Sequence, residues 1–134
     1  MTEPAPRIVL VVEDDELIRR VAAGAIAAAG FVVLQAANAL DAMTILARRD
    51  DIAVVFTDVD MPGRLNGAEL AQMLVRQAPW VSVVVTSGVH PPGRVGYAFI
   101  GKPYRIEAMI DLVRRAADAA ARGQSSLRCD RACR

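Results

Sequence analysis

The chain alternates between short apolar runs and longer stretches with helical periodicity, and this alternation constrains its fold more than any other feature. The apolar runs are rich in Val and Ile, and each is too short for a buried helix. Five such runs occur, at Ile8–Val12, Phe31–Leu34, Ala53–Thr57, Val81–Val85 and Tyr97–Ile100. Because nearly every position in them is apolar, we expect strands that are covered on both faces, as in a parallel sheet.

Between these runs Ala and Leu recur at helical spacing, and recognisable capping residues mark several helix ends. Asn38 and Asn66 each precede a helical pattern, with Asp41 and Glu69 three residues later, and Gly30 suits the position just after a helix. The predicted helices are Asp15–Ala29, Asn38 to about Arg49, Asn66 to about Ala78, and Arg105–Ala121.

The segment Ser87–Gly96, between the last two strands, contains three glycines and two prolines. Each glycine costs about 1 kcal/mol in a helix interior and a proline about 3 kcal/mol. We therefore predict that the helix at this place, the fourth in the alternation, is short or absent. His90 in this segment is expected on the surface and is assigned no role.

Strands separated by helices imply a parallel sheet with right-handed crossovers and helices on both faces. With five strands, an α/β doubly wound sheet of flavodoxin-like order 2-1-3-4-5 is the best expectation. We predict one domain over residues 7–121, preceded by an extension at 1–6 and followed by a disordered basic tail at 122–134.

Composition restricts the function classes. Residues of the hydrophobic types make up 54% of the chain, enough to fill one core, and the net charge of +1 argues neither for nor against nucleic-acid binding. The tail is too short for a DNA-binding module and no helix-turn-helix pattern lies outside residues 7–121, so we expect no nucleic-acid binding by the domain itself. No apolar run reaches the roughly 18 residues of a membrane span, and no signal segment is recognised, so we expect a cytoplasmic protein without membrane contact. Cys129 and Cys133 form a poor zinc site and are interpreted as free thiols.

Polar side chains gather at the predicted carboxyl ends of the strands. Glu13–Glu16 follow the first strand, Asp58 the third, Thr86 the fourth and Lys102 the fifth. These ends share one edge of a parallel sheet, where ligands of such folds bind. Clustered carboxylates suit Mg²⁺, and an aspartate can attack phosphorus to form an acyl phosphate. A lysine and a hydroxyl group can then neutralise the phosphoryl oxygens.

Four stretches at these strand ends resemble the receiver domains of two-component response regulators, and the likeness covers about residues 7–121. They are Val11–Glu16, Phe56–Gly63, Val85–Gly88 and Lys102–Tyr104. The resemblance implies a phosphoacceptor signalling domain, whose only chemistry is its own phosphotransfer and autodephosphorylation. Its partners would be a sensor histidine kinase or phosphotransfer protein and an unidentified downstream protein. Glu13 stands where the family more often has Asp, and the turn after Pro62 is one residue longer than in many members.

The resemblance also implies roles for individual residues. Asp58 would accept the phosphoryl group, and Mg²⁺ would be held by Glu13, Asp14, Asp58 and the backbone carbonyl of Asp60. Lys102 would bind the phosphoryl group, and the Lys102–Pro103 peptide bond would be cis. The set is completed by two residues expected to act as a switch, Thr86 and Phe99.

Several alternatives remain open from the residues alone. Each polar residue has a plain reading, such as an acidic first helical turn or a turn aspartate. Asp58-Val59-Asp60 also resembles the nucleophile motif of haloacid-dehalogenase-like phosphatases, with Asp58 attacking and Asp60 as general acid. A flavin or nucleotide module is disfavoured because no glycine-rich loop follows the first strand. The sequence leaves open whether the domain signals, relays phosphate or stores it.

Overall fold

The computed structural model describes residues 7–61, 66–88 and 97–133, with backbone alone from residue 123 onward. Five parallel strands form one sheet in the order β2-β1-β3-β4-β5. The strands are β1 Ile8–Val12, β2 Val32–Ala36, β3 Ile52–Asp58, β4 Ser82–Ser87 and β5 Ala98–Gly101. The helices in the described residues are α1 Glu16–Ala28, α2 Ala39–Arg48, α3 Gly67–Gln77 and α4 Ile106–Cys133.

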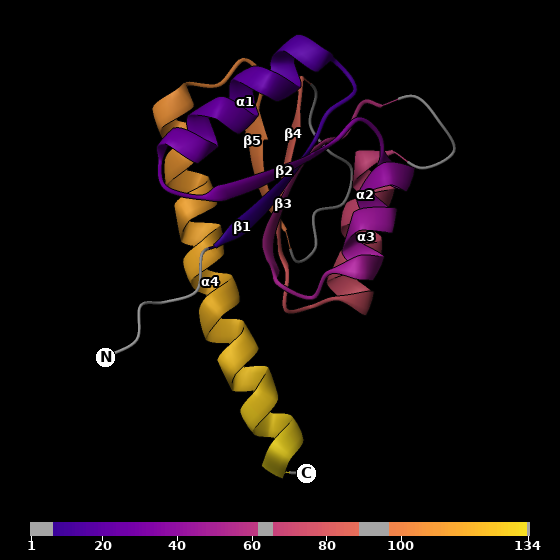
Figure 1. The fold of residues 1–134 in the computed structure, drawn as a ribbon, viewed down its shortest axis with the longest axis vertical. Helices are drawn as coiled ribbons and strands as arrows, with labels where there is room; N and C mark the ends of the chain where they lie inside the picture. Colours follow the sequence, from indigo (N-terminus) through magenta and orange to yellow (C-terminus); the bar gives the residue numbers. More distant parts are fainter. Residues whose placement is uncertain (1–6, 62–65, 89–96, 134) are drawn as a thin grey trace.

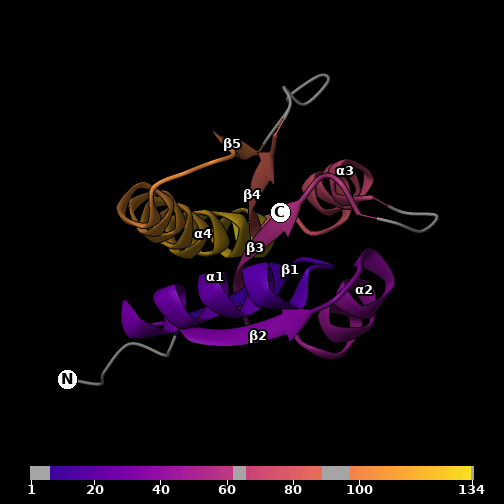
Figure 2. The same cartoon turned by 90° about the horizontal axis from the view of Figure 1, so that it is seen from above.

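The predicted fold is confirmed, with strand bounds within two residues of the expected ones. Helices α1 and α4 cover one face of the sheet, and α2 and α3 cover the other (Figure 1; Figure 2). Alternate side chains of β1 enter the two cores: Val9 and Val11 face α1 and α4, whereas Leu10 and Val12 face α2 and α3. This two-sided burial explains why the strand sequences are apolar at every position rather than at every second one.

The capping residues predicted from sequence are in place. The Asn38 side chain accepts a hydrogen bond from the Asp41 amide at 2.8 Å. Asn66 and Glu69 bond to each other's backbone amides as a capping box at the start of α3. Gly30 follows α1 with a φ of 106°, a left-handed conformation that favours glycine. These local signals fix where the helices begin and end relative to the strand ends.

The last helix departs from expectation. The sequence predicted that it ends near Ala121 and that a disordered tail follows, but the backbone of α4 continues as a helix to Cys133. Ala, Leu and Arg favour helix in this segment, and the single Gly123 costs only about 1 kcal/mol. The domain limits themselves stay a prediction.

Two further expectations fall on parts of the chain that the structure does not describe. The predicted loss of the fourth helix concerns residues 89–96, and the lengthened turn after Pro62 concerns residues 62–65, so both stay predictions. Within the described ranges, no helix has the length and apolarity needed to cross a membrane.

Candidate functional site

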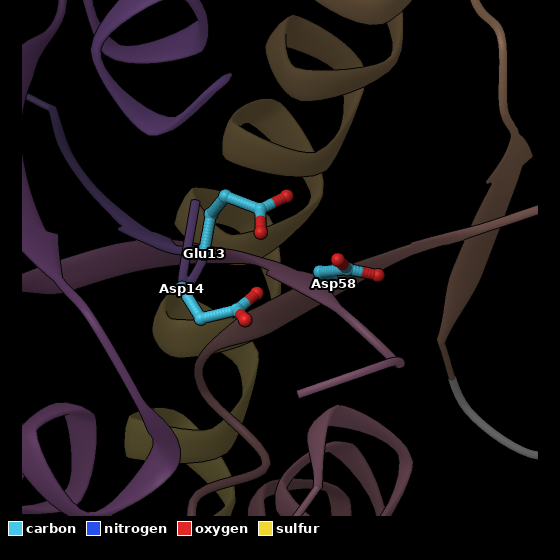
Figure 3. A group of neighbouring side chains, drawn as sticks. All are labelled: Glu13, Asp14 and Asp58. Carbon is cyan, nitrogen blue, oxygen red and sulfur yellow. The ribbon is translucent and has the colours of Figure 1, made fainter. Parts of the chain in front are cut away.

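Three carboxylates meet where β1 and β3 end. Glu13 and Asp14 follow β1 directly, Asp58 is the last residue of β3, and the two strands pair in parallel. One oxygen from each carboxylate lies within 4.8 Å of the others (Figure 3). Glu13 and Asp58 are buried and Asp14 is exposed, so the cluster opens to solvent on one side. Hard oxygen donors at this spacing suit a small divalent cation such as Mg²⁺.

Lys102, which directly follows β5, brings a positive charge to the cluster. Its Nζ donates to Asp58 Oδ2 at 3.0 Å and to Glu13 Oε1 at 3.2 Å. The Lys102 amide donates to the Ser87 carbonyl at 2.8 Å, which anchors the residue just after β5. The peptide bond between Lys102 and Pro103 is cis, in agreement with the expectation from the resemblance.

Burial and neighbouring charges shift the pKa values of Glu13 and Lys102. Burial is the main reason that the pKa of Glu13 rises to about 7, and the neighbouring Asp14 and Asp58 raise it further. Burial alone would lower the pKa of Lys102, but its bonds to Asp58 and Glu13 outweigh that effect and raise the pKa. Lys102 is therefore charged at neutral pH and offsets part of the negative charge of the cluster.

Asp58 is held at both carboxylate oxygens. Oδ2 accepts from Lys102, and Oδ1 accepts from the backbone amide of Asp60 at 3.1 Å. The Asp60 side chain in turn accepts a hydrogen bond from the buried Ser87 hydroxyl at 3.2 Å. The sequence placed Ser87 only at the start of the segment after the fourth strand, and its bond to Asp60 depends on β3 and β4 lying side by side.

Thr86 lies directly beside the candidate acceptor. It pairs with Asp58 in the register of β3 and β4 and is only 3% exposed. Its hydroxyl oxygen is buried and has no hydrogen-bond partner in the described part of the chain. A buried hydroxyl left in this way costs about 1–3 kcal/mol. The strand beside Asp58 thus carries a buried hydroxyl with no acceptor or donor among the described residues.

Phe99 lies in the neighbouring strand β5, one residue before Ile100, the partner of Thr86. It pairs with Val85 of β4 and is half-buried. Ala98 and Ile100 pack toward α1 and α4, and Tyr97 packs on the opposite core. Alternation along the strand therefore puts Phe99 on the face of α2 and α3, next to the strand that carries Thr86.

Gly67 was not singled out from the sequence, yet it shapes the site. A Cβ atom at this position would lie 1.8 Å from the Asp58 carbonyl oxygen and 2.6 Å from its carbonyl carbon. The Gly67 amide donates to the Val59 carbonyl at 3.1 Å. The start of α3 thus packs directly on the backbone that carries Asp58. The only sequence signal was a glycine immediately after the Asn66 cap.

The aromatic ring of Tyr104 packs near Lys102. Its ring meets Phe56 edge to face, with ring centroids 6.0 Å apart and an interplanar angle of 66°. Burial raises the pKa of Tyr104. The hydroxyl therefore stays protonated near neutral pH, and Tyr104 adds no negative charge beside the carboxylates.

Comparisons with known proteins agree with this geometry. The family model for the response regulator receiver domain matches residues 9–114. The receiver domain of NtrX from Brucella abortus is 30% identical, with a TM-score of 0.72 over 82% of this chain and 98% of that one. A CheY-like receiver domain from Methanospirillum hungatei has a TM-score of 0.80 at 18% identity, over 89% of this chain and 99% of that one, and supports the fold alone.

Longer relatives show the same likeness over one part of their length. The nitrogen assimilation regulatory protein NtrX of Azorhizobium caulinodans is 32% identical over 117 residues, which are 81% of this chain and 25% of that protein. The chain thus spans about a quarter of that relative. The alternative of a haloacid-dehalogenase-like phosphatase receives no support from the comparisons. This chain belongs to the response regulator receiver domain family, the phosphoacceptor domains of two-component signal transduction.

Proposed function

We propose that Asp58 is the phosphoacceptor and that its donor is a phosphohistidine on a sensor histidine kinase or a phosphotransfer protein. An Asp58 carboxylate oxygen would attack phosphorus, so that the O–P bond forms while the N–P bond of the phosphohistidine breaks. The observation that carries this proposal is the 3.0 Å contact of Lys102 Nζ with Asp58 Oδ2 beside two further carboxylates. That contact presents a fixed positive charge where phosphoryl oxygens would arrive.

Magnesium is the cofactor that the donor set fits. Glu13, Asp14, Asp58 and the backbone carbonyl of Asp60 would hold it, and water would complete the shell that Mg²⁺ prefers. When bound, the ion would neutralise phosphoryl oxygens and the mutual repulsion of the carboxylates. The spacing of at most 4.8 Å among the three carboxylate oxygens supports this assignment.

Thr86 and Phe99 are proposed to carry the signal away from Asp58. The unpaired Thr86 hydroxyl would hydrogen-bond to the phosphoryl group, and Phe99 would then pack into the space behind it. A downstream protein would recognise the changed surface of β4 and β5. Segment 89–96 lies outside the described residues. We predict that phosphorylation orders it, which amide hydrogen exchange with and without a phosphoryl mimic can test.

Phosphoryl labelling of wild type and of a variant that lacks the Asp58 carboxylate tests the proposal. Wild type incubated with Mg²⁺ and a small phosphoryl donor such as acetyl phosphate should form one base-labile acyl phosphate per chain. Asp58→Asn should form none, whereas the matched Asp60→Asn variant should keep a labelled site because only its backbone is assigned a role. Undiminished labelling of Asp58→Asn would exclude Asp58 as the acceptor. Catalytic turnover of small phosphomonoesters would instead favour an enzyme.

A further inference from the structure

Arg19, in the first turn of α1, connects β2 to the acidic pair, that is, Glu13 and Asp14 after β1. Its Nη1 donates to the backbone carbonyl of Glu13 at 3.0 Å, and its Nε donates to Gln35 Oε1 at 3.2 Å. Gln35 belongs to β2, where it pairs with Val11 of β1. Arg19 as a residue is half-buried, and its guanidinium group bonds both the loop after β1 and the end of β2.

These bonds leave the backbone of Glu13 little freedom. Its amide donates to the Ala36 carbonyl of β2 at 3.1 Å, and its carbonyl accepts from Arg19. The carbonyl belongs to the planar peptide unit that ends at the Cα of Asp14. Fixing that carbonyl therefore fixes the direction of the chain from Glu13 to Asp14. It also fixes how the carboxylates of Glu13 and Asp14 are oriented relative to each other.

Arg19 acts on this loop through geometry rather than through charge pairing. Among the described residues it forms no ion pair within 4.0 Å, although Asp14, Asp15 and Glu16 are close in sequence. Its two donors are held in one rigid plane and reach two acceptors at once. A lysine has the same charge but lacks this fork, so charge and geometry can be separated by substitution.

We propose that Arg19 is a positioning residue for the metal site, and that its bond to the Glu13 carbonyl sets the affinity of the acidic pair for Mg²⁺. This inference rests on the proposed function, because it requires that Glu13 and Asp14 hold the ion. Partners that orient the groups around a metal site typically change metal affinity by roughly 10–100-fold.

The sign of the effect distinguishes positioning from electrostatics. Removing a cation near three carboxylates should strengthen Mg²⁺ binding if charge alone mattered. Loss of a positioning bond should weaken it. The dissociation constant of Mg²⁺ is to be measured by isothermal titration on the full chain, for wild type and for Arg19→Met, Arg19→Lys and Gln35→Leu.

We expect Arg19→Met and Arg19→Lys to weaken Mg²⁺ binding by about tenfold or more. Gln35→Leu should weaken it less, because the bond from Arg19 to Glu13 persists without its orienting partner. Arg20→Met is the matched control, since Arg20 is exposed and, within the described part of the chain, forms one ion pair, with Glu16 at 3.9 Å. Its affinity should stay at or slightly above that of wild type. Labelling of Asp58 in Arg19→Met should recover at saturating Mg²⁺, which a general loss of structure would not allow.

Two results would overturn the inference alone: an Mg²⁺ affinity in Arg19→Met that equals or exceeds that of Arg20→Met, or a labelling defect that saturating Mg²⁺ does not relieve. If Arg19→Met fails to fold, Arg19→Lys and Gln35→Leu decide the question, and unchanged affinity in both contradicts it. A wild-type chain that binds no Mg²⁺ would instead overturn the proposed metal site, and this inference with it.

Discussion

Lys102 and Asp58 lie 44 residues apart in sequence, and the Nζ of the one donates to Oδ2 of the other at 3.0 Å. The same ammonium group reaches Glu13 at 3.2 Å. One cation therefore links the ends of β1, β3 and β5, and it is held at the point where the proposed chemistry takes place.

Removing this cation should weaken both the metal-free fold and phosphoryl transfer. In Lys102→Met the buried carboxylates lose a partner. We expect the free energy of unfolding of the metal-free protein, measured with a metal chelator present, to fall by about 1–3 kcal/mol. Urea denaturation of wild type and variant with and without Mg²⁺ measures this, and added Mg²⁺ should recover part of the loss. Labelling of Asp58 should fall strongly even in saturating Mg²⁺. Equal labelling of Lys102→Met and wild type would contradict the role of Lys102.

The raised pKa of Glu13 predicts a pH dependence of stability in the metal-free protein. In the folded state its pKa is about 7, against an ordinary value of 4.5. Between these values the folded chain keeps a proton that the unfolded chain has lost. Stability should therefore fall as pH rises from about 4.5 to about 7, by roughly 3 kcal/mol in total, and change little from this cause above pH 8.

Glu13→Gln isolates this contribution because glutamine does not titrate. Urea denaturation in chelator at pH 5 and pH 8 should show a smaller loss of stability in Glu13→Gln than in wild type. The difference between the two losses measures the Glu13 contribution. If the two proteins lose stability in parallel over this range, the folded-state pKa of Glu13 is not raised.

Gly67 should tolerate no side chain. In Gly67→Ala the new Cβ would overlap the Asp58 carbonyl, so β3 and α3 must move apart. We expect a loss of about 1–3 kcal/mol or more in stability, and slower labelling of Asp58. Gly24→Ala in α1 is the control, because its Cβ would meet no atom within 4 Å, and it should stabilise the helix by up to about 1 kcal/mol. Normal labelling and stability of Gly67→Ala would refute the close packing.

The exposed face of α1 should be where the phosphohistidine partner docks. Leu17 and Val21 are 73% and 54% exposed, lie one helical turn apart, and follow Asp14 closely in the chain. The double variant Leu17→Ser/Val21→Ser should slow phosphotransfer from a cognate kinase or phosphotransfer protein by about tenfold or more. Truncating a central contact residue of an interface typically removes over about 1 kcal/mol of binding free energy. Labelling by acetyl phosphate should be unchanged.

Val32→Thr provides a matched surface substitution for this experiment. Val32 is 43% exposed at the start of β2, at the end of the sheet away from Asp58. It should leave transfer from the protein donor unaltered. Equal transfer rates for the α1 double variant and wild type would place the docking surface elsewhere.

Much of this molecule follows from local features of the sequence. The five apolar runs became five parallel strands because each is short, β-branched and apolar throughout, and only a sheet covered on both faces buries such runs. Glu13, Asp58, Thr86 and Lys102 could be placed together in advance because the carboxyl ends of parallel strands share one edge. The caps at Asn38 and Asn66 were also readable, since a cap is a contact between residues three apart.

Other features were decided only when distant backbones came together. The bonds of Arg19 to the Glu13 carbonyl and to Gln35 depend on the angle at which α1 leaves β1, which no side-chain pattern reports. The need for glycine at position 67 arises from the approach of α3 to the Asp58 carbonyl, a contact between main-chain atoms. The length of α4 was misjudged because helix propensity varies weakly along its end, so that Gly123 alone does not stop it. Sequence patterns thus determined which residues reach the site, whereas the tertiary packing of main-chain groups decided how each is held.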